Sequence, residues 1–550
     1  MIDVVWLKPI PLDHFMLQDM FDDMWNPVGK LDFNIVDSFQ EATGDGVVAV
    51  VPGASNDAQE INDKLKKYSW VLLIVVSDEE NLFDIEKIDH PNIRFWIQTP
   101  RAKVEYKNAR YFGVGYAFSK KFRKQYQQEY LSKPEDVFIS GQNTHKRRNT
   151  IFRRLHKYAE DNPTKSIQIF ETKGFTQGMP SEEYYKHMAS AKVVPCPSGI
   201  VSPDSFRLYE ALEFGCIPIA DDTSPAVDYD SNGYWKRIFP DAPFPTISGR
   251  EIAGSIDKSL KRFNLHSNNV FAWWMKQKRQ YIYNLTDDIR ALADMPAHVD
   301  TLKDKITVII PVSPWKSHPD TSILETTIKS VREHLPESEI IITFDGVRSE
   351  QKDRFDDYQE FVKKMLWKIN TEYKNVLPLF FMTHSHQVKM MREALKYVRT
   401  ESVIYVEGDS PLYEDRKIEW DNITNLISSG KSNIVRLYNK ETIPVEHEYL
   451  MHHEHDLAAD NAQYIATSQW SQQPHIVRSD TYRKIIDDYF TDKSICFIED
   501  KVYYPIANDG QNGSWDKWKM YIYIPHDKKP RSYHLDGRSG EEKYDNKQVF

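Results

Sequence analysis

The chain has 550 residues, which is too long for one ordinary hydrophobic core and predicts two to four domains. Hydrophobic residues make up 40% and charged residues 28% of the sequence, as is ordinary for a folded cytosolic protein. The formal net charge of −10 argues against a protein whose whole surface binds polyanions, but it leaves room for a local basic groove.

The sequence carries no signal for disulfide bonding, export or a membrane span. Cys196, Cys216 and Cys496 lie far apart without CxxC spacing, which indicates neither a disulfide framework nor a zinc site. The N-terminal residues lack the basic and apolar regions of a secretory signal. The longest apolar run, 70–76, has the length of a strand. We therefore expect a soluble, cytoplasmic protein with no membrane segment.

Short apolar runs alternate with amphipathic helical stretches along the chain, a pattern typical of parallel α/β sheets. In the first half, seven runs have the length and composition of strands: 47–51, 71–76, 93–97, 137–140, 167–170, 193–195 and 217–220. A long helical segment at 268–293 follows and leads into the polar stretch 294–305, where we place a domain boundary.

The pattern restarts after this boundary. The apolar segment 306–314 predicts a strand that runs into a loop marked by prolines. A helix is expected next, at 323–334, and the further strands are expected at 339–344, 377–381, 403–406 and 434–437. The two halves are not copies of each other, so we expect two different α/β sheets.

The most informative segment is 196–222, which reads CPSGIVSPDSFRLYEALEFGCIPIADD. A strand ends in a loop, and a helix is expected to begin near 202–204, with Ser205 among the N-cap candidates. Its N-terminus would face the carboxyl edge of a parallel sheet, where phosphates bind. Arg207 can neutralise a diphosphate, and Glu210 can accept hydrogen bonds from ribose hydroxyls. The alternative is an ordinary βαβ crossover with an internal Arg–Glu pair.

This segment resembles the donor-binding half of GT-B glycosyltransferases, and within them the exostosin-like family. The residues that match the family pattern are Pro197, Gly199, Ser205, Arg207, Glu210, Ala211, Leu212, Gly215, Cys216, Ile217 and Pro218. The resemblance implies that Ser205, Arg207 and Glu210 bind a nucleotide-sugar donor. It also implies a GT-B-like Rossmann-type unit, with an N-terminal α/β half at 1–130 and the donor-binding half at 131–295.

A polar loop with basic residues follows the predicted strand at 137–141. In the resembled family, the first strand of the donor half also opens into a loop that carries basic residues. Lys146, Arg147 or Arg148 could therefore reach the diphosphate, and we take Arg148 as the donor-binding candidate. A solvated basic helix start is the alternative.

From residue 306 the chain resembles the inverting, family-2-like GT-A glycosyltransferases. The resemblance implies a mixed-sheet nucleotide-sugar domain at 305–550. It places Pro311 in the nucleotide loop after the first strand. It also places Asp345, at the end of the next strand, against the base or the ribose of the donor.

An acidic motif follows in SVIYVEGDSPL, residues 402–412. Its apolar strand delivers Glu407 and Asp409 to the carboxyl end, in the position of the D-x-D motif of GT-A enzymes. Carboxylates at i and i+2 can hold Mn²⁺ or Mg²⁺, which neutralises the charge that develops on a diphosphate leaving group. The alternative is an acidic turn that caps a strand.

Two later segments complete the predicted site of the second half. In FIED, residues 497–500, Glu499 and Asp500 are expected just after a short apolar strand. In the GT-A family an acidic pair at this place deprotonates the acceptor hydroxyl, so Asp500, or else Glu499, is the candidate general base. Near the C-terminus, His526 and His534 are candidates for a third metal ligand, and we choose His534.

Exostosin-like and GT-A segments in this order resemble bifunctional glycan polymerases. We therefore expect an enzyme that transfers a sugar from a nucleotide-sugar, with UDP as the expected nucleotide, to a hydroxyl of a glycan or polysaccharide. A second hypothesis is a hydroxymethylated DNA base, the acceptor of phage glycosyltransferases. The basic stretches 120–124 and 146–157 could track phosphates, although the net charge speaks against this. A third is that one domain only binds or positions the acceptor.

Overall fold

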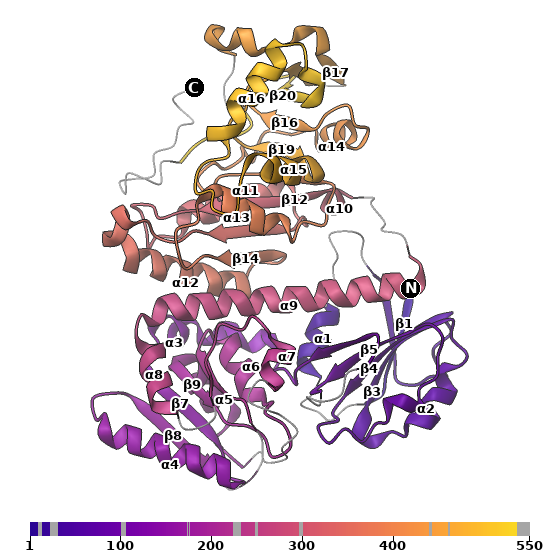
Figure 1. Ribbon diagram of the computed structural model, residues 1–550, viewed down its shortest axis with the longest axis vertical. Helices are drawn as coiled ribbons and strands as arrows, with labels where there is room; N and C mark the ends of the chain where they lie inside the picture. Colours follow the sequence, from indigo (N-terminus) through magenta and orange to yellow (C-terminus); the bar gives the residue numbers. More distant parts are fainter. Residues whose placement is uncertain are drawn as a thin grey trace. The chain divides into compact units, whose positions relative to one another are not determined.

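The computed structural model describes residues 1–8, 14–22, 31–100, 106–172, 174, 177–223, 233–247, 251–295, 301–438, 443–459 and 462–535. These residues divide into two compact units, of which the first ends at residue 295 and the second begins at residue 301 (Figure 1).

The first unit begins with a sheet of six parallel strands in the order β2-β1-β3-β4-β5-β6. The strands are β1 (Ile2–Trp6), β2 (Phe33–Val36), β3 (Gly46–Pro52), β4 (Trp70–Val76), β5 (Ile93–Gln98) and β6 (Ala109–Phe112). Every residue of β3 and β4 is buried, because both strands are apolar on both faces. Helix α2 (Ala58–Leu65) packs on one face of this sheet through Ile61 and Leu65.

A second sheet of the first unit has five parallel strands in the order β11-β10-β9-β7-β8. The strands are β7 (Glu135–Gln142), β8 (Ile167–Thr172), β9 (Ala191–Cys196), β10 (Ile217–Asp221) and β11 (Thr246–Ile247). Helices α4 (Lys146–Asp161) and α8 (Ile252–Leu260) pack on one face. Helix α5 (Ser181–Ser190) lies on the other, where Tyr184 packs edge-on against Phe138.

The remaining α-helices of the first unit are α1 (Phe15–Asp22), α3 (Gln127–Ser132), α6 (Phe206–Glu213), α7 (Tyr234–Ile238) and α9 (Phe263–Ala293). Helix α6 connects β9 to β10 and packs against both strands. The long helix α9 contacts β4 and β5 of the first sheet and β10 of the second, so it joins the two sheets (Figure 1). Both sheets are parallel and Rossmann-like, as the sequence predicted.

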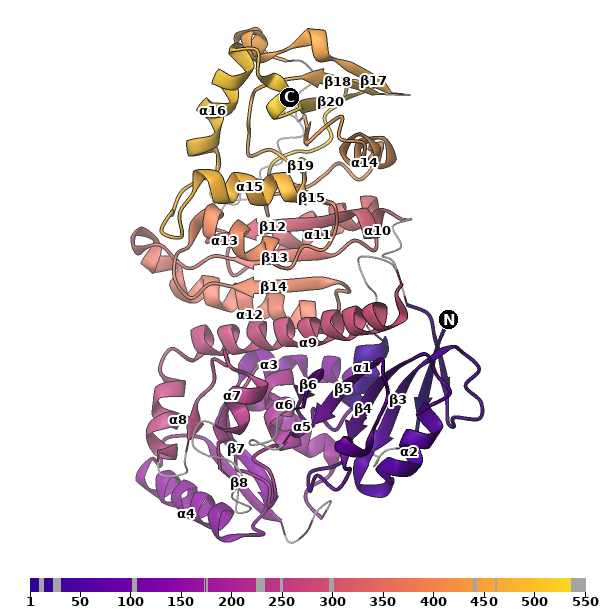
Figure 2. The ribbon, with the colours of Figure 1, turned by 45° about the vertical axis from the view of Figure 1, so that its right-hand side comes forward.

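The second unit contains one mixed sheet of nine strands in the order β14-β13-β12-β15-β19-β16-β20-β18-β17 (Figure 2). The strands are β12 (Ile306–Val312), β13 (Ile340–Phe344), β14 (Val376–Phe380), β15 (Ser402–Tyr405), β16 (Ile434–Leu437), β17 (Leu457–Ala459), β18 (Ala462–Ala466), β19 (His475–Arg478) and β20 (Met520–Pro525). Strands β12 to β15 pair in parallel, and β19 runs antiparallel between β15 and β16.

The α-helices of the second unit are α10 (Leu302–Lys305), α11 (Ser322–His334), α12 (Phe355–Thr371), α13 (His386–Leu395), α14 (Trp420–Ser428), α15 (Ser479–Tyr489) and α16 (Glu499–Gln511). Helices α13, α15 and α16 share one hydrophobic cluster with the sheet, through Val388, Tyr482 and Val502 among others. In the part of the chain that the structure describes, no helix combines the length and the apolar character needed to cross a membrane.

Except for the short strand expected just before Glu499, the strands that the sequence predicted are present, with ends shifted by at most a few residues. The sequence missed β1, β2, β6 and β11 of the two parallel sheets and β17 to β20 of the mixed sheet. The helix predicted at 268–293 begins earlier, at Phe263.

Three local predictions were wrong. Pro311, which was expected in the nucleotide loop after the first strand of the second half, lies inside β12, where it pairs with Thr343 of β13. No strand precedes Glu499 and Asp500: these residues form the first turn of α16, since Ile498 already has helical backbone angles. The helix expected to begin near 202–204 begins at Phe206 instead. Asp204 donates its backbone amide to Ser202 Oγ at 3.0 Å, and this turn postpones the helix until Ser205 takes the N-cap position.

Candidate functional site

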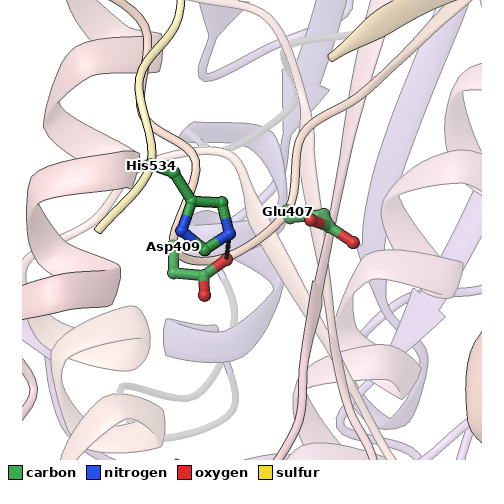
Figure 3. A group of neighbouring side chains, drawn as sticks. All are labelled: Glu407, Asp409 and His534. Atoms are coloured by element: carbon green, nitrogen blue, oxygen red, sulfur yellow. Dashed lines mark ion pairs between the residues drawn. The ribbon is translucent and has the colours of Figure 1, made fainter. Parts of the chain in front are cut away.

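Three polar side chains of the second unit come together beyond the end of β15. Glu407, Asp409 and His534 each offer one ligand atom, and these atoms all lie within 4.8 Å of one another. His534 Nε2 is 3.6 Å from Asp409 Oδ1 (Figure 3). Asp409 is buried, whereas Glu407 and His534 are partly exposed. The structure therefore brings together the three residues that the sequence assigned to a metal.

A glycine between the two carboxylates keeps them close to the neighbouring strand. Gly408 donates its backbone amide to the Pro311 carbonyl of β12 at 3.2 Å. A Cβ on Gly408 would lie 2.9 Å from Trp315 Cη2 and 3.1 Å from the Pro311 carbonyl oxygen. Any larger residue would push the acidic segment away from β12, so the E-G-D sequence is required by packing as well as by chemistry.

His534 reaches the acidic pair because the C-terminal segment pairs with the chain beyond β15. Leu535 donates its amide to the Asp409 carbonyl at 2.7 Å, and Tyr533 donates to the Pro411 carbonyl at 3.1 Å. An antiparallel bridge between Leu412 and Ser532 continues this pairing. The histidine is thus held over the acidic motif by backbone hydrogen bonds, independently of any metal.

The donor set fits a divalent cation. Carboxylate oxygens are the ligands that Mg²⁺ and Mn²⁺ prefer, and Mn²⁺ also accepts an imidazole nitrogen. Tyr405 donates its hydroxyl hydrogen to Glu407 Oε1 at 3.4 Å. Hydrogen bonds of this kind orient a carboxylate for metal binding.

Asp345 lies at the end of β13, on the same edge of the sheet as the acidic motif. Its buried carboxylate accepts hydrogen bonds from the backbone amides of Ser385 at 2.7 Å and His386 at 3.1 Å. It also lies 2.9 Å from His384 Nδ1. In the structure Asp345 thus fixes the loop that leads into α13, and its contact with a nucleotide stays a prediction.

Glu499 and Asp500 have different surroundings on the first turn of α16. Glu499 is half-buried, and burial raises the pKa of its carboxyl, whereas the charge of Arg436 opposes this rise. Asp500 is exposed, and its carboxylate accepts the backbone amide of Phe497 at 3.1 Å. A raised pKa is expected of a general base, and Glu499 has one; the hydrogen bond of Asp500 stabilises the turn before α16.

Arg436 lies buried near Glu499. It donates to the Gln469 carbonyl at 2.7 Å and to Gln469 Oε1 at 3.1 Å. Burial lowers the pKa of its guanidinium to about 10. A cation buried beside a candidate base favours the ionised form of that base.

In the first unit, two arginines meet at the carboxyl ends of β7 and β9. Arg207, on the first turn of α6, donates Nε and Nη2 to the Ser140 carbonyl at 3.0 and 2.5 Å. Arg148, on α4, donates Nε to the Ser198 carbonyl at 2.8 Å. Burial and the nearby charge of Arg207 lower the pKa of Arg148 to about 10. The fold therefore holds two cations together against their mutual repulsion.

Unused hydrogen-bonding groups lie in the same region. Ser198 Oγ, Ser205 Oγ and Arg207 Nη1 are buried and find no hydrogen-bond partner among the residues that the structure describes. Ser205 is the N-cap of α6, yet its side chain makes no capping hydrogen bond. A helix N-terminus with two cations and unused buried groups favours an anionic ligand.

The other candidates of this region are already engaged. Glu210 is buried, and its carboxylate accepts the hydroxyls of Tyr184 at 2.7 Å and Tyr185 at 3.4 Å. Burial raises the pKa of Glu210. Arg147 forms an ion pair with the buried Asp221. Its charge is therefore neutralised within the protein.

Sequence reasoning missed several of these residues. Ser198 lies within the segment that carries the exostosin resemblance, so its position in that loop could have drawn attention to it. Arg436, in an otherwise apolar strand, gave a weak signal of a buried charge. Gln387, whose contacts are described below, gave none, because a single glutamine in an amphipathic helix is ordinary.

No protein-family model and no curated protein matches the chain. Among solved structures, TarS 1–349 from S. aureus matches at 15% identity with a TM-score of 0.25, over 40% of this chain and 57% of that chain. A cytidylyltransferase from Leptospira borgpetersenii matches at 12% identity with a TM-score of 0.23, over 40% of this chain and 75% of that one. The mannosyltransferase PcManGT from Pyrobaculum calidifontis, in complex with GDP-Man and Mn²⁺, matches at 10% identity with a TM-score of 0.24, over 40% and 56%.

This chain thus spans little more than half the length of the TarS and mannosyltransferase structures.

Proposed function

We propose that the protein is a glycosyltransferase that uses a nucleotide-sugar and a divalent cation in its second unit. The observation that carries this proposal is the cluster of Glu407, Asp409 and His534 at the carboxyl edge of the mixed sheet. Ligands bind at this edge in α/β sheets. A bound Mn²⁺ or Mg²⁺ would neutralise the charge that develops on the diphosphate as the sugar leaves.

The remaining residues of the site have separable roles in this proposal. Glu499 accepts the proton of the acceptor hydroxyl while the acceptor oxygen bonds to the anomeric carbon and the bond to the diphosphate oxygen breaks. Its half-buried position and raised pKa support this role, and the exposed Asp500 becomes the less suitable base. Asp345 and Pro311 keep the nucleotide loop and the acidic motif in place through the backbone contacts described above.

For the first unit we propose a metal-independent site for the diphosphate of a nucleotide-sugar. Its support is the pair of Arg148 and Arg207 beside the unused hydroxyls of Ser198 and Ser205. Glu210 acts there by fixing Tyr184 and Tyr185 next to Arg207, since both its oxygens already accept their hydroxyls. Whether this unit transfers sugar or only binds is an outcome of the test below.

For the acceptor we propose a glycan hydroxyl. The alternative, a hydroxymethylated DNA base, is supported by one surface feature, the exposed Lys146, Arg153 and Lys157 on α4. The basic stretches 120–124 and 146–157 also contain two arginines that form ion pairs within the protein. Arg123 pairs with the buried Glu213, and Arg147 pairs with Asp221. The reduced number of free cations favours the glycan.

A screen of UDP-, GDP- and CMP-sugars, with Mn²⁺ or with EDTA, tests the function. We expect nucleotide release that requires the cation, and transfer to oligosaccharide acceptors. Transfer only to hydroxymethylated DNA would replace the glycan by the DNA acceptor. Turnover that survives EDTA would move the chemistry to the first unit, and the absence of any binding or turnover with all three donor classes would refute the proposal.

A further inference from the structure

One buried glutamine connects the three segments of the second unit that the sequence analysis identified separately. Gln387 is 4% exposed and lies on the first turn of α13. The backbone amide of the preceding residue, His386, is held by Asp345 Oδ2 at 3.1 Å. The position of Gln387 is therefore fixed from the end of β13.

The amide nitrogen of Gln387 leads to the acidic motif. Gln387 Nε2 donates to the Tyr405 hydroxyl oxygen at 2.7 Å. Tyr405 in turn donates its hydrogen to Glu407 Oε1 at 3.4 Å. Because a phenol has one hydrogen, the donor from Gln387 forces Tyr405 to direct that hydrogen to Glu407.

The carbonyl oxygen of Gln387 leads to the candidate base. Gln387 Oε1 accepts the backbone amide of Ile498, the residue that precedes Glu499, at 2.7 Å. It also accepts Gln472 Nε2 at 3.1 Å, and Gln387 Nε2 donates to Gln472 Oε1. The backbone amide of Gln472 hydrogen-bonds to the carboxylate of Glu499. Both routes end at the first turn of α16.

We propose that Gln387 is a positioning residue that couples occupancy of the cation site to the placement of Glu499. For the role of Glu499 as the general base, this inference rests on the proposed function. A cation bound by Glu407 fixes the carboxylate, which orders Tyr405 and then the amide of Gln387. The opposite end of the same amide holds Ile498, so the first turn of α16 is ordered when the donor and its cation are bound. The loss of an outer-shell hydrogen bond of this type commonly lowers metal affinity or activity by about 10–100-fold.

Hydrogen exchange of the full chain measures this coupling without reference to turnover. In the wild type, saturating Mn²⁺ should slow exchange in a peptide that contains Ile498. In Gln387→Met, exchange of this peptide should rise about five-fold or more without metal, because one hydrogen bond is lost, and Mn²⁺ should no longer slow it. The coupling is overturned if Mn²⁺ protects the peptide equally in both proteins.

A second variant separates the two ends of the network. Gln387→Glu keeps an acceptor for the Ile498 amide but lacks the donor to Tyr405, whose hydrogen then turns from Glu407 to the new carboxylate. Basal protection of Ile498 should remain and its response to Mn²⁺ should disappear. A retained response in this variant would contradict the proposed route through Tyr405, even if Gln387→Met does not fold.

Kinetics add the functional readout, with Ile341→Val in β13 as a control for a general loss of stability. Both Gln387 variants should lower kcat about ten-fold or more and change KM for the donor little, whereas the control should keep kcat. An equal loss in Ile341→Val would reduce Gln387 to a packing residue. If the wild type transfers no sugar but the Mn²⁺-dependent protection is present and lost in the variants, the coupling stands and the proposed function fails.

Discussion

The backbone amide of Leu535 donates to the carbonyl of Asp409 at 2.7 Å, and this bond holds the C-terminal segment against the acidic motif. His534 is the residue between this bond and the next one, from Tyr533 to Pro411. Strand-like pairing over a long sequence separation therefore brings the third candidate ligand to the cation site, and no metal is needed to hold it there.

The acidic pair should control cation binding. Asp409→Asn is expected to weaken Mn²⁺ binding about ten-fold or more, because it removes the charge of a buried ligand, and to abolish Mn²⁺-dependent turnover. Glu407→Gln should have a milder effect, because Glu407 is partly exposed and a water molecule can replace its oxygen as a ligand. Calorimetric titration with Mn²⁺ measures both. The control is Glu414→Gln, an exposed carboxylate of the same unit that pairs with Lys329. Unchanged affinity in Asp409→Asn would remove the metal assignment.

His534 can be tested against a histidine of the same segment. His534→Ala should weaken Mn²⁺ binding about ten-fold through the loss of one ligand, with little change in melting temperature, because the backbone pairing remains. His526→Ala, at an exposed position outside the cluster, should bind Mn²⁺ like the wild type. Equal affinities for both variants would leave the site with two carboxylates only.

The turnover of two amide variants should show which of the two carboxylates is the general base. Glu499→Gln is expected to retain donor and Mn²⁺ binding and to lose turnover about 100-fold or more. Asp500→Asn should keep turnover and lower stability by about 1 kcal/mol or less, because the exposed carboxylate accepts one backbone amide, that of Phe497 before the helix. Loss of turnover in Asp500→Asn, with turnover retained in Glu499→Gln, would identify Asp500 as the general base.

The pH dependence of kcat/KM should also report Glu499. The base must be ionised to accept a proton, so activity falls as the pH drops through its pKa. Since burial raises this pKa, the acidic limb should lie above the ordinary glutamate value of 4.5. Arg436→Met removes the charge that opposes the rise and should move the limb to higher pH. A limb at or below the ordinary value in the wild type would argue against Glu499.

In the first unit, Arg207→Ala should weaken the binding of UDP or pyrophosphate measured in EDTA. The expected loss is about 1.5–3 kcal/mol, the contribution of a charge-assisted hydrogen bond. Arg153→Ala, on the exposed face of α4, is the matched control and should bind normally. If both variants bind like the wild type, the unused groups around α6 are not a diphosphate site.

Asp204 should make the stability of the first unit depend on pH. This buried carboxylate accepts the amide of Val114 at 2.8 Å and the hydroxyl of Tyr234, and burial raises its pKa to about 6. The folded chain therefore holds the proton more tightly than the unfolded chain, whose value is near 3.8. The contribution of Asp204 to stability is therefore largest below that value and falls by about 3 kcal/mol as the pH rises to about 6. Melting temperatures across this range should show the fall in the wild type and a smaller one in Asp204→Asn.

The sequence by itself determined the central strands and the local motifs on them. Uninterrupted apolar runs of strand length, such as 71–76 and 306–312, predict strands that are buried on both faces. The sequence therefore predicted β4 and β12 directly. The spacing of Glu407 and Asp409 at the end of such a strand is equally local. The structure places the two residues in a turn after β15, closed by a hydrogen bond from the Ser410 amide to the Glu407 carbonyl at 2.9 Å.

Only the tertiary structure decided which distant residues complete these motifs. The pairing of the C-terminal segment with residues 409–412 is what brings His534, the histidine chosen from the sequence, to the acidic motif. Helical backbone angles at Ile498 replace an expected strand by the start of α16, where Glu499 is half-buried and Asp500 is exposed. Gln387 became important solely because three separate segments end around it. Such contacts depend on long-range backbone pairing and burial, which periodicity and spacing do not encode, because those patterns report only what neighbours along the chain require.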